Sequence, residues 1–356
     1  MSGDIRIMTI SSQIACQFPD KCIISQLNQL SLGMDVNQIA STINQEIATL
    51  QYGQHPPELY QPIQYMMSLG GKRLRPVLTI LASYLFTDTW ERFVKPAIAV
   101  EVFHNFTLMH DDIMDAAPLR RGKPTVHTQW NNNVAILSGD VMLVNAYELL
   151  LELPTQQLSS VIRRFNRCAA EVCEGQQLDM NFEKQTDVTE EDYLEMIRLK
   201  TAALLGFSLE MGGLMAGADH KNTTLLYELG ESIGIGFQLK DDLLDVFGEQ
   251  SKVGKQVGGD IMANKKTFLL IKALKEAQEQ DLEELEYWLK QTNFKPEEKV
   301  KAVTAIYERL GIRQIAENKM NEYFALGMFC LDKLHADAAK KEVLKEFIEQ
   351  IINREN

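Results

Sequence analysis

Residues 225–245 read LLYELGESIGIGFQLKDDLLD, and the first part of this stretch decides the fold. Its apolar residues recur three, four and seven positions apart, which is the spacing of one face of an α-helix. They are Leu225, Leu226, Leu229, Ile233 and Phe237. The same spacing recurs between Tyr193 and Leu205. Alternating runs closed by Asn-Gly or Asp-Gly, which are typical of β-hairpins, are absent from the sequence.

Proline placement extends the helical pattern to most of the chain. The ten prolines lie at positions 19, 56, 57, 62, 76, 96, 118, 124, 154 and 296, so 155–295 and 297–356 contain none. A proline inside a helix costs about 3 kcal/mol, and proline-free stretches rich in Leu, Glu, Lys, Gln and Met favour helices. We therefore predict an all-α protein.

Glycine, proline and asparagine indicate where the helices begin and end. The expected features are a helix end at 70–71, a helix from Pro96 to Asp115, a loop over 118–124, a helix start at 131–133 and a polar interruption over 254–264. None of these breaks is a long Ser/Gly/Pro linker, so we predict one large helical domain over 34–356. Residues 1–33 lack helical periodicity and fit a secretory signal poorly, and we expect them to form a flexible N-terminal extension.

Composition excludes several classes of protein. The 356 residues include 36 Lys and Arg against 49 Asp and Glu, a net charge of −13, whereas binding nucleic acid needs a surplus of cations. No uncharged apolar run approaches the roughly 20 residues of a membrane-spanning helix. The five cysteines, at 16, 22, 168, 173 and 330, form no CxxC pair. We therefore expect a soluble, cytoplasmic protein with reduced thiols, without nucleic acid as a partner and without a transmembrane segment.

Two aspartate clusters carry the first sign of chemistry. HDDIMD spans 110–115 and DDLLD spans 241–245, and each follows an apolar run. Asp111 and Asp115, like Asp241 and Asp245, are four positions apart and share one helix face. Two like charges 4 Å apart repel by about 4 kcal/mol at an effective dielectric of about 20. A divalent cation bound between the carboxylates makes the net electrostatic energy favourable. One such cluster is often a solvated helix end, but two favour an oxygen-ligated Mg²⁺ site.

Basic residues gather beside these clusters in an otherwise acidic chain. GGKRLRP at 70–76 places Lys72, Arg73 and Arg75 next to a Gly-Gly turn, and RRGK at 120–123 follows the first cluster. Lys255 and Lys265 follow the second cluster. Arginine binds phosphate oxygens in bidentate fashion and lysine supplies compact charge. The alternation of acidic and basic clusters indicates a polyphosphate bridged by metal and clamped by cations.

These motifs resemble the trans-prenyl diphosphate synthases, also called polyprenyl synthetases. The matching elements are GGKRLRP, DDIMD followed after four residues by RRG, Lys200-Thr201, FQLKDDLLD and GK(x)₄D(x)₄K, in order from about Tyr60 to Thr267. The resemblance implies an all-α bundle around a central cavity. It also implies a short-chain prenyltransferase that condenses isopentenyl diphosphate with an allylic diphosphate of five to fifteen carbons.

The resemblance assigns roles to individual residues. It implies that Asp111 and Asp115 ligate two Mg²⁺ ions, that Asp241 ligates a third, and that Asp112, Asp242 and Asp245 act through water or neighbouring ligands. Contacts to the allylic diphosphate are expected from Arg120, Lys200, Lys255 and Lys265. Contacts to isopentenyl diphosphate are expected from Lys72, Arg75, His104 and Arg121. Thr201 and Gln238 are expected near the carbocation.

Two of these assignments have alternatives. His104 could be an ordinary core histidine, and Lys266 could reach inward in place of Lys265. Taken together, the resemblance implies a catalytic set of Asp111, Asp115, Asp241, Lys200, Thr201, Gln238 and Lys255.

Product length depends on the depth of the pocket for the prenyl tail. Phe106 and Thr107 lie five and four residues before Asp111, and Phe103 lies about one turn further along the helix. In the family, aromatic residues at both of the nearer positions go with C15 products and small residues with longer ones. One aromatic there indicates geranylgeranyl diphosphate (C20), with farnesyl diphosphate (C15) as the next candidate.

Three other readings use parts of the same pattern. A terpene cyclase carries a DDxxD but would lack GGKR and the second DDxxD. An HD-type phosphohydrolase would explain His110-Asp111 but not the basic clusters. A non-catalytic subunit of a heteromeric prenyl synthase would be expected to lose the Asp-rich motifs, which are intact here. The resemblance also implies a homodimer.

Overall fold

The structure is a computed structural model that describes residues 34–248 and 258–353. The expected N-terminal extension, 1–33, lies outside the described residues, as does Lys255. The single-domain prediction for 34–356 remains an interpretation.

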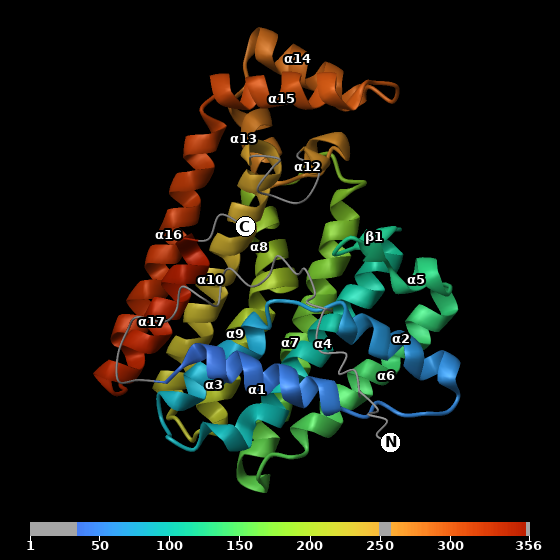
Figure 1. Ribbon diagram of the computed structural model, residues 1–356. Helices are drawn as coiled ribbons and strands as arrows, with labels where there is room; N and C mark the ends of the chain where they lie inside the picture. The colour runs from blue at the N-terminus through green and yellow to red at the C-terminus, as the bar shows by residue number, and fades with distance from the viewer. Residues whose placement is uncertain (1–33, 249–257, 354–356) are drawn as a thin grey trace, which may run out of the picture.

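The described chain is almost entirely helical, which confirms the all-α prediction (Figure 1). The N-terminal half contains α1 (Val36–Thr49), α2 (Pro57–Ser68), α3 (Leu74–Tyr84), η3 (Trp90–Phe93), α4 (Val94–Met114), β1 (Leu119–Arg120), β2 (Lys123–Pro124), α5 (Val126–Gln129), α6 (Asn132–Leu150) and α7 (Thr155–Phe182). The rest contains α8 (Glu190–Ile197), η4 (Arg198–Ala202), α9 (Ala203–Met215), α10 (His220–Phe247), α12 (Gly259–Met262), α13 (Phe268–Glu276), α14 (Glu279–Lys290), α15 (Pro296–Arg309), α16 (Ile312–Lys333) and α17 (Ala338–Asn353).

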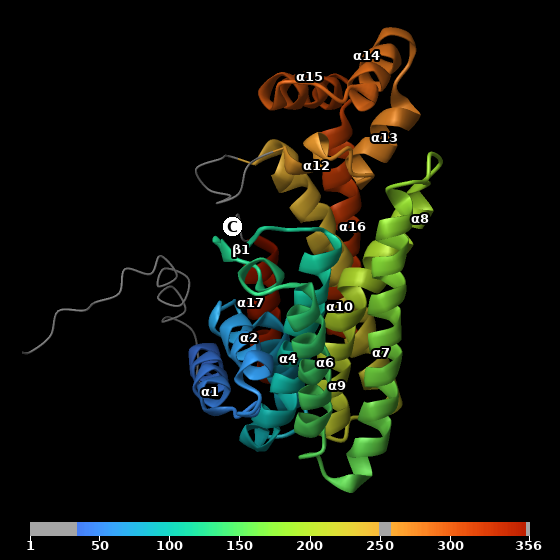
Figure 2. The same cartoon turned by 90° about the vertical axis from the view of Figure 1, so that its right-hand side faces the viewer.

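The long helices form a bundle. Figure 2 shows α4, α6, α7, α9 and α10 running side by side, with α1 and α2 on the outside. One hydrophobic cluster fills this bundle, and a second lies where α8, α13 and α15 pack around the upper part of α10. Helices α14 and α15 cross the upper end of the bundle (Figure 1). No helix among the described residues is long and apolar enough to span a membrane.

Local chemistry explains most helix boundaries. The predicted break at 70–71 lies between α2 and α3. Asn131 is the N-cap of α6, and its side chain accepts a hydrogen bond from the amide of Val134, as expected for asparagine at this position. Helix α4 begins at Val94, two residues before the predicted start, because proline is tolerated in the first turn.

The prediction of a loop over 118–124 was wrong in one respect. Leu119 and Arg120 pair with Pro124 and Lys123 in a two-stranded antiparallel ladder. The connecting residues Arg121 and Gly122 have φ of 53° and 74°, and positive φ at both central positions is the geometry of a tight hairpin turn. Arginine rarely adopts such a φ, and this turn has Arg-Gly where Asn-Gly or Asp-Gly is usual. The sequence therefore gives no signal for a hairpin here.

Candidate active site

The first aspartate cluster lies at the C-terminal end of α4 and faces Arg120 from the hairpin. Asp112 is only 1% exposed, and both of its oxygens accept from Arg120 Nε at 2.9 Å. Arg120 also lies 3.7 Å from Asp111 Oδ2. Burial raises the pKa of Asp112, and the hydrogen bond from Arg120 opposes that rise. The geometry therefore makes Asp112 an anchor for Arg120.

Lys200 joins this cluster to α7. It lies in η4, a short π-helix, and its Nζ lies 2.6 Å from Asp179 Oδ2 and 3.3 Å from Asp111 Oδ1. The Oδ1 atom of Asp111 is buried and accepts no hydrogen bond. Gly175 on α7 permits the close approach, because a Cβ there would lie 2.2 Å from the Lys200 backbone nitrogen. Such π segments occur often at functional sites.

The second cluster lies near the end of α10 and is connected to η4. Asp242 is buried, accepts hydrogen bonds from Tyr193 Oη and from Gln238 Nε2 (3.2 Å), and burial raises its pKa to about 7. Gln238 Oε1 accepts from Thr201 Oγ1 at 3.2 Å. Asp245 Oδ2 accepts from the backbone amide of Asp260 at 2.9 Å. A continuous set of contacts thus runs from Asp242 to the segment that carries Lys200.

Lys265 is the cation that faces both clusters. Burial alone would lower its pKa, but the charges of Asp179, Asp260, Asp242 and Asp115 together raise it. Lys266 points elsewhere, since its Nζ donates to the carbonyl of Phe182 at the end of α7 (2.7 Å).

The carboxylates fit a hard divalent cation. Burial and the charge of Asp111 raise the pKa of Asp115, so these groups resist carrying negative charge together. Within 34–248 and 258–353, no three carboxylate, imidazole or thiol groups already converge on one point. Mg²⁺ commonly takes one or two carboxylates and completes its shell with waters and phosphate oxygens. Asp111 Oδ1, which is buried and has Lys200 Nζ 3.3 Å away but accepts no hydrogen bond, is suited to such a partly protein-built shell.

The cationic turn between α2 and α3 lies across a cavity from Gln238. Lys72 and Arg75 line this cavity of about 220 Å³ together with Thr201, Gln238 and Asp241. Its other walls come from α3, α9, α10 and α17: Leu74, Leu78, Leu205, Leu209, Gly230, Ile233, Gly234, Phe237, Ile348 and Ile351. Arg75 Nε is buried without a hydrogen bond. The cavity therefore combines charged groups, two of them cationic, with apolar walls.

Arg73 does not contribute its charge to this cavity. It is 5% exposed and donates to Glu101 Oε1 (2.5 Å) on α4 and to the carbonyl of Met67 (3.1 Å) on α2. Its φ of 51° turns the side chain inward between two cations that line the cavity. Arg73, the one cation of GGKRLRP to which the resemblance assigns no substrate contact, is therefore paired with Glu101.

His104 and Arg121 lie on the side of the first cluster. Burial and the surrounding charges of Arg75, Arg121, Arg120 and Arg73 lower the pKa of His104 well below its usual value. Arg121 donates to the carbonyl of Gly70, so the hairpin is docked on the Gly-Gly turn. Burial lowers the pKa of Arg121. Arg75 and Arg121, whose charges act on His104 and which pair with no carboxylate among the described residues, are suited to an anion.

Comparison with known proteins decides the family. Residues 56–307 match the sequence profile of the family described as Polyprenyl synthetase. The chain belongs to this family. The geranylgeranyl pyrophosphate synthase of Geoglobus acetivorans is 41% identical over 239 residues, which are 67% of this chain and 75% of the relative. The geranylgeranyl diphosphate synthase of Methanosarcina mazei is 35% identical over 92% of this chain and 99% of its own length.

A crystal structure of a geranylgeranyl pyrophosphate synthase agrees with the sequence comparison. It superposes with a TM-score of 0.86 and 39% identity, over 91% of this chain and 100% of the other. The polyprenyl synthetase described here is therefore a short-chain prenyltransferase with the all-α isoprenoid synthase fold. Synthases of this family use Mg²⁺ to bind diphosphate.

In this synthase, aromatic rings fill the bundle beneath the first cluster. The ring of Phe106 lies 4.8 Å from that of His110 and 5.6 Å from that of Phe103. Phe103 in turn lies 5.1 Å from Phe165 on α7. Thr107 has a small side chain. Its Oγ1 donates to the carbonyl of His104 at 2.8 Å, which holds the side chain against α4. Phe106 therefore lies between the ring of His110, next to Asp111, and the ring of Phe103.

Asp179 was not among the residues predicted for the site, and Asp260 was predicted without a role. Asp179 pairs with Lys200, and both carboxylates face Lys265. Asp179 lies on α7, outside the two Asp-rich motifs. Asp260 stands within the GK(x)₄D(x)₄K motif, and that motif was a usable signal.

Proposed function

We propose that this synthase condenses isopentenyl diphosphate with allylic diphosphates of up to fifteen carbons and releases geranylgeranyl diphosphate. The observation that carries the proposal is the joining of both aspartate clusters through Lys200, Thr201 and Gln238, beside a cavity that also contains Lys72 and Arg75. One diphosphate fits against the carboxylates through metal, and the other fits against the cationic turn.

Asp111, Asp115 and Asp241 would hold three Mg²⁺ ions, with Asp112, Asp242 and Asp245 as supporting groups. When bound, these ions supply Lewis acidity that withdraws charge from the allylic diphosphate. Arg120, Lys200, Lys255 and Lys265 hold that diphosphate and stabilise the negative charge that grows on it as its C–O bond breaks. Lys72, Arg75, His104 and Arg121 hold isopentenyl diphosphate with its double bond beside the cation.

The polar oxygens near the reacting carbons complete the site. Because Thr201 Oγ1 donates to Gln238 Oε1, the threonine lone pairs remain available to face the allylic cation. The double bond attacks the cation, a carbon–carbon bond forms, and one proton leaves to the departing diphosphate. The products are pyrophosphate and a chain longer by five carbons. Apolar walls such as Leu209 and Ile233 exclude water from the cation.

Incubation with Mg²⁺, labelled isopentenyl diphosphate and C5, C10 or C15 allylic starters tests the proposal. We expect a C20 product from the purified chain alone. Asp111→Ala and Asp241→Ala should lose turnover by about 100-fold or more. Asp332→Ala, which changes an exposed carboxylate on α16, should keep it. Near-full activity in either cluster variant would contradict the metal assignment, and a C15 or C25 product would contradict the chain length.

The same assay separates the first two alternatives, and a nucleotide phosphatase assay tests the third. A terpene cyclase would consume the allylic diphosphate and ignore the isopentenyl one, and a non-catalytic subunit would give no product without a partner. Release of phosphate from nucleotides would indicate a phosphohydrolase.

A further inference from the structure

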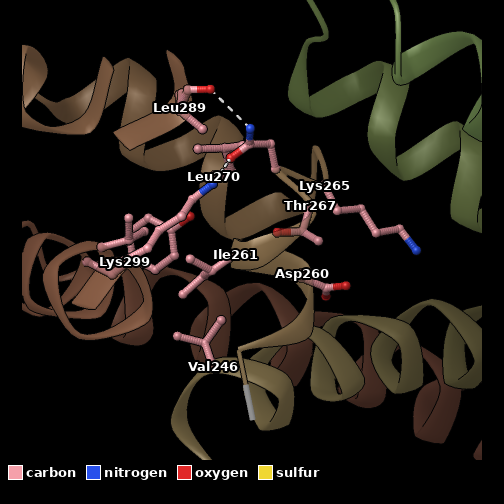
Figure 3. Close-up of a pocket in the computed structure, with 11 residues that line it drawn as sticks. Val246, Asp260, Ile261, Lys265, Thr267, Leu270, Leu289 and Lys299 are labelled. Carbon is pink, nitrogen blue, oxygen red and sulfur yellow. Dashed lines mark hydrogen bonds between the residues drawn. The ribbon is translucent and has the colours of Figure 1, made fainter. Parts of the chain in front are cut away.

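A lysine is buried behind α12 and the loop that follows it, which carry Asp260 and Lys265 (Figure 3). Lys299, on α15, has no exposed surface. Its Nζ donates to Asn264 Oδ1 at 2.6 Å and lies 4.3 Å from the centre of the Phe294 ring. In the described parts of the chain, Asn264 is its hydrogen-bond acceptor and no carboxylate pairs with it.

This burial is unfavourable for an ammonium group. Removing a charge from water without a counter-ion is penalised, and burial accordingly lowers the pKa of Lys299. A methionine of similar length would fill the same volume without that penalty. The ammonium group must therefore supply something that an apolar side chain cannot, and its contact with Asn264 indicates what that is.

Asn264 uses both ends of its amide to bind the helices behind it. Oδ1 accepts from Lys299, and Nδ2 donates to the carbonyl of Leu289 at the end of α14 (3.0 Å). Its backbone lies in the left-handed region, with φ of 52°. Asparagine tolerates this conformation better than most residues, but the side-chain contacts fix its orientation.

The loop between α12 and α13 is thereby held from the side opposite the carboxylates. A Cβ at Gly258, the N-cap of α12, would lie 2.6 Å from the side chain of Val300, so α15 also packs closely on the start of α12. The amide of Lys265 donates to the carbonyl of Asp260 at 2.9 Å. Figure 3 shows the Lys265 side chain extending away from Lys299. The charges that act on it belong to Asp179, Asp260, Asp242 and Asp115.

We propose that Lys299 is a positioning residue that, through Asn264, holds Lys265 over the carboxylates and so sets the affinity for the allylic diphosphate. The proposal rests on the function proposed above. Lys299 itself contacts neither cluster, and its effect passes through one amide side chain to the next residue of the loop.

Full-length Lys299→Met and Asn264→Gly variants test the proposal. Glycine keeps the left-handed backbone and removes the amide. We expect KM for the allylic diphosphate to rise about tenfold in each, with KM for isopentenyl diphosphate unchanged. The double variant should be no worse than Asn264→Gly alone, because that variant already removes the contact with Lys299. Asn264→Asp, which can still accept from Lys299 but no longer donates to the Leu289 carbonyl, should raise the allylic KM less than Asn264→Gly.

Two further measurements separate positioning from general damage. Lys301→Met changes an exposed lysine on the same helix and should leave both KM values unchanged. Calorimetry with inorganic pyrophosphate and Mg²⁺ should show about tenfold weaker binding to the Lys299→Met and Asn264→Gly variants. An allylic KM within twofold of wild type, or a parallel rise of both KM values, would overturn the proposal. If wild-type protein turned over no allylic substrate, the proposed function would fail, and the pyrophosphate titration would still decide the role of Lys299.

Discussion

At the scale of single residues, Phe106 separates the carboxylate end of α4 from the aromatic cluster beneath it. Its ring rests on Phe103, which rests on the fully buried Phe165. We predict that Phe106→Ala lengthens the product by about one five-carbon unit, because the deeper rings still block further growth. Chromatography of the dephosphorylated products measures the change.

Neighbouring variants provide the controls for this prediction. Phe103→Ala alone should leave the product unchanged, because Phe103 lies behind Phe106. Thr107→Phe should shorten the product toward C15, since a second aromatic ring would narrow the same level of the helix. An unaltered product distribution in Phe106→Ala would remove Phe106 from the floor of the tail pocket.

His104 should make stability depend on pH. Burial and the four nearby arginines lower its folded pKa, whereas the unfolded side chain titrates near 6.5. Between these two values the unfolded state binds more protons, so the free energy of unfolding rises with pH. Stability should therefore fall by up to about 1.4 kcal/mol for each pH unit below 6.5. Denaturant unfolding at pH 5.5 and 7.5 should show a smaller difference in His104→Gln than in wild type. Equal differences would show that His104 does not resist protonation.

At the scale of single elements, the π-helix η4 sets the positions of Lys200 and Thr201 between α7 and α10. We predict that Gly175→Ala lowers kcat about 100-fold, because the new methyl group displaces the η4 backbone from α7 and misplaces Lys200. Overpacking should reduce stability by about 1–3 kcal/mol.

Gly213→Ala on α9 is the matched control for this change. Its Cβ would lie 2.7 Å from Leu226 Cδ1, so it overpacks the core without touching a residue that lines the cavity. It should lose comparable stability and keep kcat. Equal losses of kcat in both variants would show that η4 has no special role.

The limits of sequence reasoning are also clearest at this scale. Periodicity and proline placement predicted the long helices because their signals are local, and the paired carboxylates of α4 and α10 are visible as spacing. The inward turn of Arg73 depends on Glu101, which lies 28 positions away on another helix. The role of Asp179 depends on where η4 packs, and the hairpin depends on an arginine with positive φ. These features follow from tertiary contacts that leave no local pattern.

At the scale of the whole molecule, the bundle brings distant charges to one end. Helices α4 and α10 deliver their carboxylates there, while the hairpin, η4 and the loop before α13 each supply a cation from a different part of the chain (Figure 2). Arg120 and Lys200 are paired with carboxylates, and four carboxylates act electrostatically on Lys265. Helices α14 and α15 contact the loop before α13 through Leu289 and Lys299, which bind the Asn264 side chain.

One face of the bundle remains apolar where no described element covers it. Leu137, Val144 and Leu151 recur at intervals of seven on α6 and at its C-terminal end, and they are 58%, 57% and 54% exposed. A seven-residue repeat forms a single stripe along a helix, which is typical of helix packing between subunits. We predict that this stripe is the centre of a homodimer interface, and that Val144→Lys yields a monomer in sedimentation velocity or light scattering.

Loss of the dimer should also weaken the site, since α6 supports α4 next to the first cluster. His110 lies 3.1 Å from the carbonyl of Ile136 on α6 and four residues after Phe106 on α4. Freed of its partner, α6 would lose the packing that keeps this contact in place, and turnover should fall with dilution in a weakened dimer. Leu326→Lys, which alters an exposed leucine on α16, should remain dimeric and active. A monomeric wild-type protein, or a dimeric Val144→Lys variant, would place the interface elsewhere.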